Sequence, residues 1–259
     1  YTFKKLHFVS SNADVFTPDK LLELKNRLMN DKQYDIIMIQ EAKPKNFRRQ
    51  LTKIEYDISD YDLEWENMGE QEPGRGLITY VRKGINYKRV FFDVPFVEYL
   101  AVVIDLNKRE KLLAVNIYHS PNSDIANTTA LNSLILKIAD ERKYSSIFTA
   151  GDGNFKHINW QQMVCSTSEN SKDFIFLETI KDAFFEQHIK QPTRGRGSDR
   201  PSTLDLMITK NDDVLEEVTI EAPLGRSDHA VLKASLLCNY EPKPVKKTRF
   251  LYDQADYSK

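Results

Sequence analysis

Nine short apolar segments constrain the fold of this chain more than any other feature of its sequence. Each has the length of a β-strand, is enriched in aliphatic residues, and is bounded by polar residues, glycine or proline. They are residues 4–10, 35–40, 76–81, 100–106, 111–118, 146–152, 203–209, 216–222 and 229–237. No apolar run approaches the roughly 18 residues that a membrane-spanning helix needs, so we expect no membrane partner.

Three segments between these strands have the apolar periodicity of amphipathic helices. The first, residues 18–30, begins with Pro18 and follows Thr17, a residue type that caps helix N-termini. The other two are residues 126–143 and 172–187. The expected apolar faces consist of Leu21, Leu22, Leu24 and Leu28, then Leu131, Leu134, Ile135 and Ile138, and finally Phe174, Leu177 and Ile180.

The strands outnumber the helices and do not alternate with them one to one. This order disfavours a Rossmann fold or a TIM barrel and favours an α/β (α+β) chain, with two mixed β-sheets packed into a sandwich and flanked by helices. Residues 1–240 show no internal repeat and predict one domain, whereas residues 241–259 combine proline with basic residues and predict a linker. Because the chain does not begin with Met, we expect a domain excised from a longer protein.

The overall charge makes no case for a nucleic-acid partner. The chain has 37 Lys and Arg residues against 38 Asp and Glu residues, a net charge of −1. Any such case must therefore come from local basic patches. The two cysteines, Cys165 and Cys238, lack zinc-site spacing and are too few for a disulfide framework, which favours ordinary thiols in a reducing compartment.

Polar and ionisable side chains gather where six of the expected strands begin or end. They are Asn12, Asp14, Glu41, Tyr118, Asp152, Asn154, Asp205, Asp228 and His229. Strand ends are where α/β enzymes assemble their sites. Hard carboxylate oxygens without thiolates suit Mg²⁺, with Mn²⁺ as a substitute. A metal, a carboxylate that activates water, and amide or imidazole donors are the parts that phosphodiester hydrolysis requires.

Each of these residues also has a structural interpretation. Asn12 and Asp14 are common turn formers, Tyr118 can be a half-buried aromatic, and the residues 227–229 can cap a helix or form a loop. Asp205 is different, because a carboxylate inside an apolar strand needs a partner. The coincidence of all of them at strand ends favours a catalytic site.

The order of the motifs resembles the endonuclease/exonuclease/phosphatase superfamily, which includes DNase I, the AP endonucleases and the LINE-type endonucleases. The matching motifs are N-x-D at 12–14, QE at 40–41, the strand ending at Tyr118, GDxN at 151–154, LDL at 204–206 and SDH at 227–229. The resemblance covers residues 3–236 and implies a four-layered DNase I-like fold.

Three further segments resemble the apurinic-type endonuclease domain of LINE-type (non-LTR) retrotransposons. They are IYHSPNS at 117–123, GDGNFKHINW at 151–160 and RFLYDQADYSK at 249–259. The last resembles the stretch that leads to the reverse transcriptase in the ORF2 polyprotein, which implies a reverse transcriptase domain in the same polypeptide. Gly153 replaces a usual Phe, His119 and Ser120 replace a usual Arg and Pro, and Asp14 is retained as in repair enzymes.

The resemblance also implies a role for each site residue. Glu41 would be the main Mg²⁺ ligand, helped by Asp14 and Asp228. Asp152 would deprotonate the attacking water, and Asn154 would orient Asp152 or the phosphate. His229, held by Asp205, would donate to a phosphate oxygen, while Asn12 and Tyr118 would contact the phosphate or metal-bound water. The implied product is a nick with a 3′-hydroxyl that primes target-primed reverse transcription.

Several basic residues are candidates for contact with double-stranded DNA. A Gly-rich segment before Asp205 carries Arg194, Arg196 and Arg200, and related nucleases have a DNA-probing hairpin there. The alternative is a solvated loop. Lys43 and Arg48, with their neighbours Lys45 and Arg49, follow Glu41 and fit phosphate contact and a solvated helix face equally well. Arg75 lies on a predicted loop.

Two other functions remain open at this point. One is a superfamily enzyme with another substrate: an AP-type repair endonuclease, an RNA deadenylase or a phosphoinositide phosphatase. The other is a domesticated DNA-binding module without activity, against which all the expected catalytic positions are filled. A retroelement enzyme would be made in the cytoplasm and act in the nucleus; the sequence indicates no oligomeric state.

Overall fold

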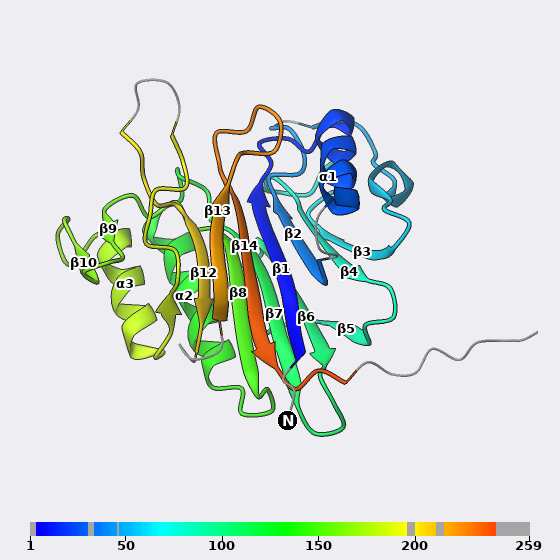
Figure 1. The fold of residues 1–259 in the computed structure, drawn as a ribbon. Helices are drawn as coiled ribbons and strands as arrows, with labels where there is room; N and C mark the ends of the chain where they lie inside the picture. The colour runs from blue at the N-terminus through cyan, green and yellow to red at the C-terminus, as the bar shows by residue number, and fades with distance from the viewer. Residues whose placement is uncertain (1–3, 31–33, 46, 196–199, 211–214, 242–259) are drawn as a thin grey trace, which may run out of the picture.

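Two six-stranded β-sheets form the centre of the protein (Figure 1). The computed structural model describes residues 4–30, 34–45, 47–195, 200–210 and 215–241. The first sheet consists, in spatial order, of β13 (Leu215–Glu221), β14 (Val231–Cys238), β1 (Lys4–Asn12), β2 (Ile36–Gln40), β4 (Leu77–Arg82) and β3 (Tyr61–Glu66). The second consists of β11 (Glu186–Gln187), β12 (Asp205–Thr209), β8 (Ser146–Asp152), β7 (Lys111–Tyr118), β6 (Tyr99–Asp105) and β5 (Tyr87–Val90).

All nine expected strands are present. The sequence did not reveal β3, β5 or β11, nor the two-residue strands β9 (Ile158–Asn159) and β10 (Val164–Cys165), which pair with each other. These strands are short or strongly polar, so the apolar pattern that marks a buried strand is weak in them.

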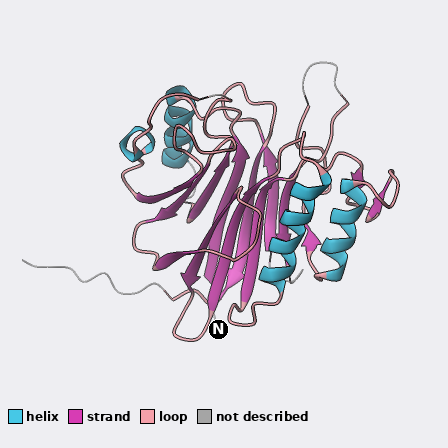
Figure 2. Cartoon of the chain, turned by 180° about the vertical axis from the view of Figure 1, so that it is seen from behind, coloured by secondary structure: helices cyan, strands magenta, loops and turns pink. Residues whose placement is uncertain are grey.

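The sheets pack face to face, and helices cover both outer faces. Side chains such as Phe8 and Phe148, whose ring centroids lie 4.2 Å apart, fill the space between the sheets. The helices α2 (Ile125–Ala139) and α3 (Lys172–Asp182) pack on the second sheet. On the first sheet lie α1 (Pro18–Asn30) and the 3-10 helix η1 (Lys53–Tyr56). Figure 2 shows α2 and α3 on one flank and α1 on the other. The predicted four-layered, DNase I-like arrangement is confirmed.

The expected helix α1 is confirmed at both ends, and Thr17 caps it: the Lys20 amide donates to Thr17 Oγ1 over 3.4 Å. The prediction for its apolar face was wrong at Leu22, which is 58% exposed, while Leu21 and Leu24 are buried. Leu22 points away from the sheet because it falls outside the stripe that contacts the core.

The other two helices end earlier than expected. α2 ends at Ala139 rather than at residue 143, because the chain must turn there to begin β8 at Ser146. α3 ends at Asp182 rather than at 187, and residues 186–187 pair with β12 instead. Its fully buried aromatic residue is Phe176, not Phe174, which is only half-buried.

The strand directions explain why the polar strand ends meet. β1 runs parallel to β2, and β7 runs parallel to β8, so all four end at the same edge of the sandwich. β12 is antiparallel to β8, and β14 is antiparallel to β1, so these two strands begin at that edge. Carboxyl ends of four strands and amino ends of two others therefore surround one location, which we call the catalytic edge after the catalytic residues that the sequence predicts there. Among the described residues, no helix is long and apolar enough to cross a membrane.

Candidate active site

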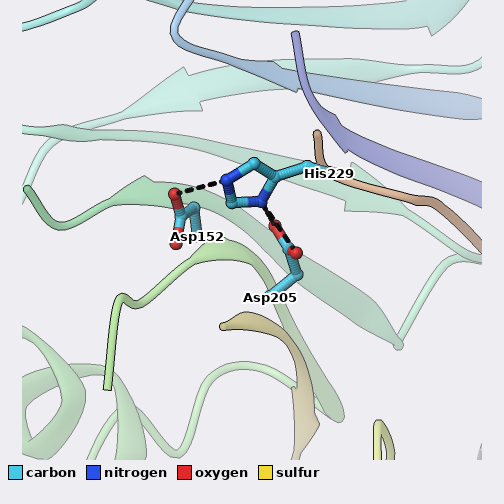
Figure 3. Close-up of side chains that lie close together, drawn as sticks. All are labelled: Asp152, Asp205 and His229. Carbon is cyan, nitrogen blue, oxygen red and sulfur yellow. Dashed lines mark hydrogen bonds and ion pairs between the residues drawn. The ribbon is translucent and has the colours of Figure 1, made fainter. Parts of the chain in front are cut away.

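The centre of the catalytic edge is a buried carboxylate–imidazole–carboxylate arrangement (Figure 3). Asp152, the last residue of β8, pairs in register with Asp205, the first residue of β12. His229 lies between them: its Nδ1 is 3.0 Å from Asp205 Oδ2, and its Nε2 is 3.8 Å from Asp152 Oδ2. All three residues are at most 4% exposed. Asp205 thus has the partner that a buried carboxylate requires.

The charges around His229 favour its protonated form. Burial alone would lower the pKa of this imidazole, but the charge of Asp205, its hydrogen bond, and the charges of Asp152 and Asp228 outweigh burial and raise the pKa to about 10. Because the Asp205 carboxylate can only accept from His229 Nδ1, Nδ1 carries a proton, and the second proton of the imidazolium lies on Nε2. The ring can therefore donate from Nε2 toward the centre of the edge.

Asp152 is set up differently. Burial raises the pKa of this carboxyl group above its usual range, the charge of His229 acts in the opposite direction, and the charges of Asp205 and Glu41 raise it further. The backbone amide of Asn154 donates to Asp152 Oδ1 over 3.1 Å, and Asn12 Nδ2 donates to Asp152 Oδ2 over 2.8 Å. A carboxylate whose proton affinity is raised in this way is suited to accept a proton.

Asn12 joins this arrangement to the first sheet. Its Nδ2 also donates to Glu41 Oε1 over 2.9 Å, and its Oδ1 accepts from the Asp14 amide over 2.9 Å. Arg75 closes the far side: Nη1 lies 2.6 Å from Glu41 Oε2, and Nη2 lies 3.4 Å from Asp14 Oδ1. The structure thus brings Asn12, Asp14 and Glu41 together with Asp152, as the sequence predicted.

The backbone of the first-sheet half is left-handed at several positions. Asp14, Val15 and Glu41 have φ values of 39°, 69° and 49°, and Asn154 on the other side has 54°. Such values are uncommon outside glycine, and for the β-branched Val15 they are strained. Lys20 supports this turn, because its buried Nζ donates to the carbonyl oxygens of Ala13 and Asp14 over 2.5 and 3.0 Å.

Tyr118 and Asn154 complete the predicted set at the catalytic edge. Burial, the charges of Glu41 and Asp152, and a hydrogen bond to Glu41 raise the pKa of Tyr118 well above its ordinary value, so it keeps its proton. Asn154 Nδ2 donates to the carbonyl oxygen of His119 over 2.9 Å. The side chain of Asn154 therefore stabilises the turn after β8, while its amide orients Asp152.

The carboxylate of Asp228 is bound by the side chain of Arg194. Arg194 Nε donates to Asp228 Oδ2 over 3.0 Å, and Asp228 Oδ1 lies 3.9 Å from His229 Nε2. Burial raises the pKa of Asp228, but its contacts with Arg194 and the charge of His229 prevail and lower it. Arg194, expected as a DNA contact, is thus tied to the site at the base of its hairpin, where it also forms a β-bridge with His229.

The donor set fits a divalent metal ion. Five carboxylates, those of Asp14, Glu41, Asp152, Asp205 and Asp228, surround three cationic side chains, those of Arg75, Arg194 and His229. The excess of negative charge and the hard oxygen donors suit Mg²⁺ or Mn²⁺. One ligand atom each of Asp152, Asp205 and His229 lies within 4.8 Å of the others. A protonated His229 cannot ligate, however, so Glu41 and Asp14, which already share a cation, are the better candidates.

The other expected DNA-contact residues have different positions. Lys43 is only 2% exposed and its Nζ donates to the carbonyl oxygens of Gly69 and Glu72, so its expected surface position was wrong. The carbonyl oxygens that bind it lie 26 and 29 residues away in sequence. Arg48 and Arg200 are exposed, and Arg196 lies outside the described residues. Of the expected linker, only Glu241 is described.

Several supporting residues were not found from the sequence. Thr193 Oγ1 accepts from the Asp205 amide over 3.1 Å, and Ser227 Oγ donates to the Asn12 carbonyl oxygen over 2.7 Å. His119 is fully buried: its Nδ1 donates to the Gly153 carbonyl oxygen over 2.9 Å, and it stacks on Phe155. Glu98 is a further, half-buried carboxyl group, and it accepts a hydrogen bond from the Arg75 backbone amide. Ser227 belongs to the SDH motif and His119 to the 117–123 segment, but the sequence assigned a role to neither.

Comparisons with known proteins agree with this arrangement. A family model described as "Endonuclease-reverse transcriptase" matches residues 112–233, which include Tyr118, Asp152, Asp205 and His229. No curated protein matches the chain in sequence. The match to this part of the chain and the shared fold agree with the resemblance to the endonuclease/exonuclease/phosphatase superfamily that the motifs carry.

Three solved structures illustrate the shared fold. The endonuclease domain of TRAS1, a telomere-specific non-LTR retrotransposon, matches with a TM-score of 0.65 and 15% identity over 91% of this chain and 100% of that chain. The AP endonuclease LMAP from Leishmania major matches with 0.66 and 13% over 90% and 88%. D. rerio TDP2, complexed with a single strand DNA product, matches with 0.59 and 13% over 90% and 98%.

Proposed function

We propose that the chain is a Mg²⁺-dependent DNA endonuclease that nicks target DNA and leaves a 3′-hydroxyl for target-primed reverse transcription. The observation that carries this proposal is the buried set of Asp152, His229 and Asp205, linked through Asn12 to Glu41. It combines a proton acceptor, a proton donor and a cation site within one connected network. Phosphodiester hydrolysis needs these three functions.

In this mechanism each side chain has one task. Asp152 takes a proton from the attacking water, since burial and neighbouring charges raise its proton affinity. His229 donates from Nε2 to a phosphate oxygen, and Asp205 holds the ring. The water oxygen bonds to phosphorus as the P–O3′ bond breaks, which leaves a 5′-phosphate, and the 3′-oxygen takes up a proton from solvent to become the 3′-hydroxyl. A divalent ion held by Glu41 and Asp14 would supply positive charge against the charge that builds up on the phosphate.

The retroelement role rests on the segments 117–123, 151–160 and 249–259, on the family match, and on the fold shared with the TRAS1 domain. It implies that the chain acts beside a reverse transcriptase domain in one polypeptide, with residues 241–259 as the linker. Double-stranded DNA in the nucleus would then be its substrate.

An incubation of supercoiled plasmid with the protein tests this proposal. We expect Mg²⁺-dependent conversion to the nicked circle, no conversion with EDTA, and ends that a polymerase extends without prior phosphatase treatment. The control is Asp173→Asn, which changes a buried aspartate of α3 outside the site. Undiminished nicking by Asp152→Asn would rule out the assigned role of Asp152.

A second candidate is an AP-type repair endonuclease. The observation that favours it is Asp14, which is retained as in repair enzymes and lies in the site next to Arg75. A duplex oligonucleotide with a single abasic site, compared with the same duplex without it, separates the two functions. A preference for the abasic duplex of more than about 100-fold would favour repair over target nicking.

A further inference from the structure

Arg75 lies inside the candidate site rather than on the exposed surface. Its side chain is 12% exposed, and all of its contacts lie on one side of the catalytic edge. Nη1 lies 2.6 Å from Glu41 Oε2, Nη2 lies 3.4 Å from Asp14 Oδ1, and Nε donates to the Lys43 carbonyl oxygen over 3.1 Å. The guanidinium therefore joins the two carboxylates that are the better candidates for holding a metal ion.

The backbone around Arg75 is built to hold it there. Gly74 and Gly76 have φ values of 82° and 76°, a region that favours glycine. A Cβ at Gly74 would lie 2.4 Å from Glu98 Oε1, so a side chain there would displace Glu98. The Lys43 amide donates to the Arg75 carbonyl oxygen over 2.8 Å, and the Ala42 amide donates to that of Gly76 over 3.1 Å.

The half-buried Glu98 and the buried Lys43 hold this loop in place. Glu98 accepts a hydrogen bond from the Arg75 backbone amide. Lys43 Nζ binds the carbonyl oxygens of Gly69 and Glu72, which lie in the same segment of chain as Arg75. An arginine that merely approached DNA would not need such support, because long flexible side chains reach phosphates from exposed loops.

The geometry points to Arg75 as a resident cation of the metal site: we propose that it holds Glu41 and Asp14 together before a divalent ion binds, and that the ion competes with it for these carboxylates. This inference rests on the proposed function only in that a divalent ion binds Glu41 and Asp14. A carboxylate oxygen 2.6 Å from a guanidinium nitrogen cannot ligate an ion without bringing two positive charges close together.

Removal of this charge has two opposite consequences. Metal-free Arg75→Gln loses the cation between Glu41 and Asp14, so its melting temperature falls below that of the wild type. The same variant binds the ion more tightly, by about tenfold, because the repulsion is gone. Arg75→Lys keeps the positive charge and binds the ion within about twofold of the wild type.

The experiment measures Mn²⁺ affinity by electron paramagnetic resonance and the rise in melting temperature on Mg²⁺ addition. The matched control is Arg82→Gln. It removes the same positive charge from Arg82, at the end of β4, which forms an ion pair with Asp35. We expect tighter binding and a larger thermal shift only in Arg75→Gln. Unchanged or weaker Mn²⁺ binding by a cooperatively melting Arg75→Gln protein would overturn the proposal.

A measurement on the wild type does not depend on the stability of the variant. The Nε–H resonance of Arg75, assigned by its loss in Arg75→Lys, should shift when Mg²⁺ is added, and an unmoved resonance at saturation would also overturn the proposal. Glu41→Gln should abolish Mn²⁺ binding, and retained binding would place the ion elsewhere and refute the competition. Failure of the wild type to nick plasmid, with these binding results intact, would refute only the nuclease function.

Discussion

The two halves of the candidate site are built in different ways. The second-sheet half places Asp152 and Asp205 opposite each other in register on paired strands, and Nδ1 of His229 is hydrogen-bonded to Asp205. The first-sheet half places Asp14 and Glu41 on left-handed backbone beyond the ends of β1 and β2. It is held together by Arg75 and by hydrogen bonds of Asn12.

The carboxylates of the two halves also differ in how deeply they are buried. The side chains of Asp152 and Asp205 are 1% and 3% exposed, whereas those of Glu41 and Asp14 are 11% and 46% exposed. The regular half is therefore preorganised by strand pairing, and the irregular half can adjust when a cation binds. In the proposed mechanism, the proton transfers take place in the preorganised half. The proposed divalent ion binds in the adjustable half.

The strongest test of the preorganised half is Asp152→Asn. The amide keeps the size of the side chain and cannot accept the proton of water, so we expect nicking to fall by about 10³-fold or more. Initial rates on supercoiled plasmid measure the loss, and circular dichroism checks the fold. If the loss were below tenfold, the proton acceptor would have to be sought in the adjustable half.

Asp205→Asn tests the link between strand pairing and proton position. Without this carboxylate the pKa of His229 falls from about 10 toward its ordinary value, so the imidazolium loses its proton at lower pH. We expect about 100-fold slower nicking at pH 8 and an alkaline loss of activity that begins at least about one pH unit earlier. The pH–rate profile measures both. If the activity of the variant fell at the same alkaline pH as that of the wild type, the result would contradict the role of Asp205.

Stability at low pH tests the turn that carries Asp152. Burial lowers the pKa of His119 to about 4, from an ordinary 6.5. Below pH 6.5 the imidazole of His119 binds a proton in the unfolded chain but not in the folded chain. The free energy of unfolding is therefore highest above that pH and decreases as the pH falls toward 4. His119→Asn should remove roughly 3 kcal/mol of this pH dependence. Urea unfolding at several pH values measures the free energy of unfolding of the wild type and the variant. The same dependence of this free energy on pH in both proteins would refute the prediction.

The smallest expected effects concern the surface. Shortening residues 195–200, with Arg194 kept in its contact with Asp228, should change the nick-site spectrum more than the rate on random plasmid, since this segment is expected to probe DNA rather than to cut it. Arg48→Gln, at an exposed position, should weaken DNA binding by only about threefold and reduce the salt slope by about 1. Salt-dependent binding titrations and nick mapping measure these effects. An unaltered nick-site spectrum would show that the hairpin does not select the site.

The sequence alone predicted the strands and the placement of the candidate catalytic side chains at their ends. This was possible because apolar runs and turn residues are local features that do not depend on distant partners. The GDxN segment illustrates this: Asp152 ends β8, Asn154 follows it, and Phe155 and Trp160 pack on α3 through Phe176. The α3 boundary was not predictable in the same way, because residues 186–187 belong to a strand only through pairing with β12.

Only the tertiary structure decided which charges meet. Arg75 and Lys43 both read as surface residues, yet one joins Glu41 to Asp14 and the other is buried beneath the same loop. Asp14 and Arg75 are 61 residues apart, and Arg194 and Asp228 are 34 apart. A sequence pattern specifies which face of its own element a residue occupies. Whether a cationic side chain contacts a carboxylate or solvent depends on how distant segments pack. Such packing lowers the free-energy cost of burying a charged side chain when it places an opposite charge beside it.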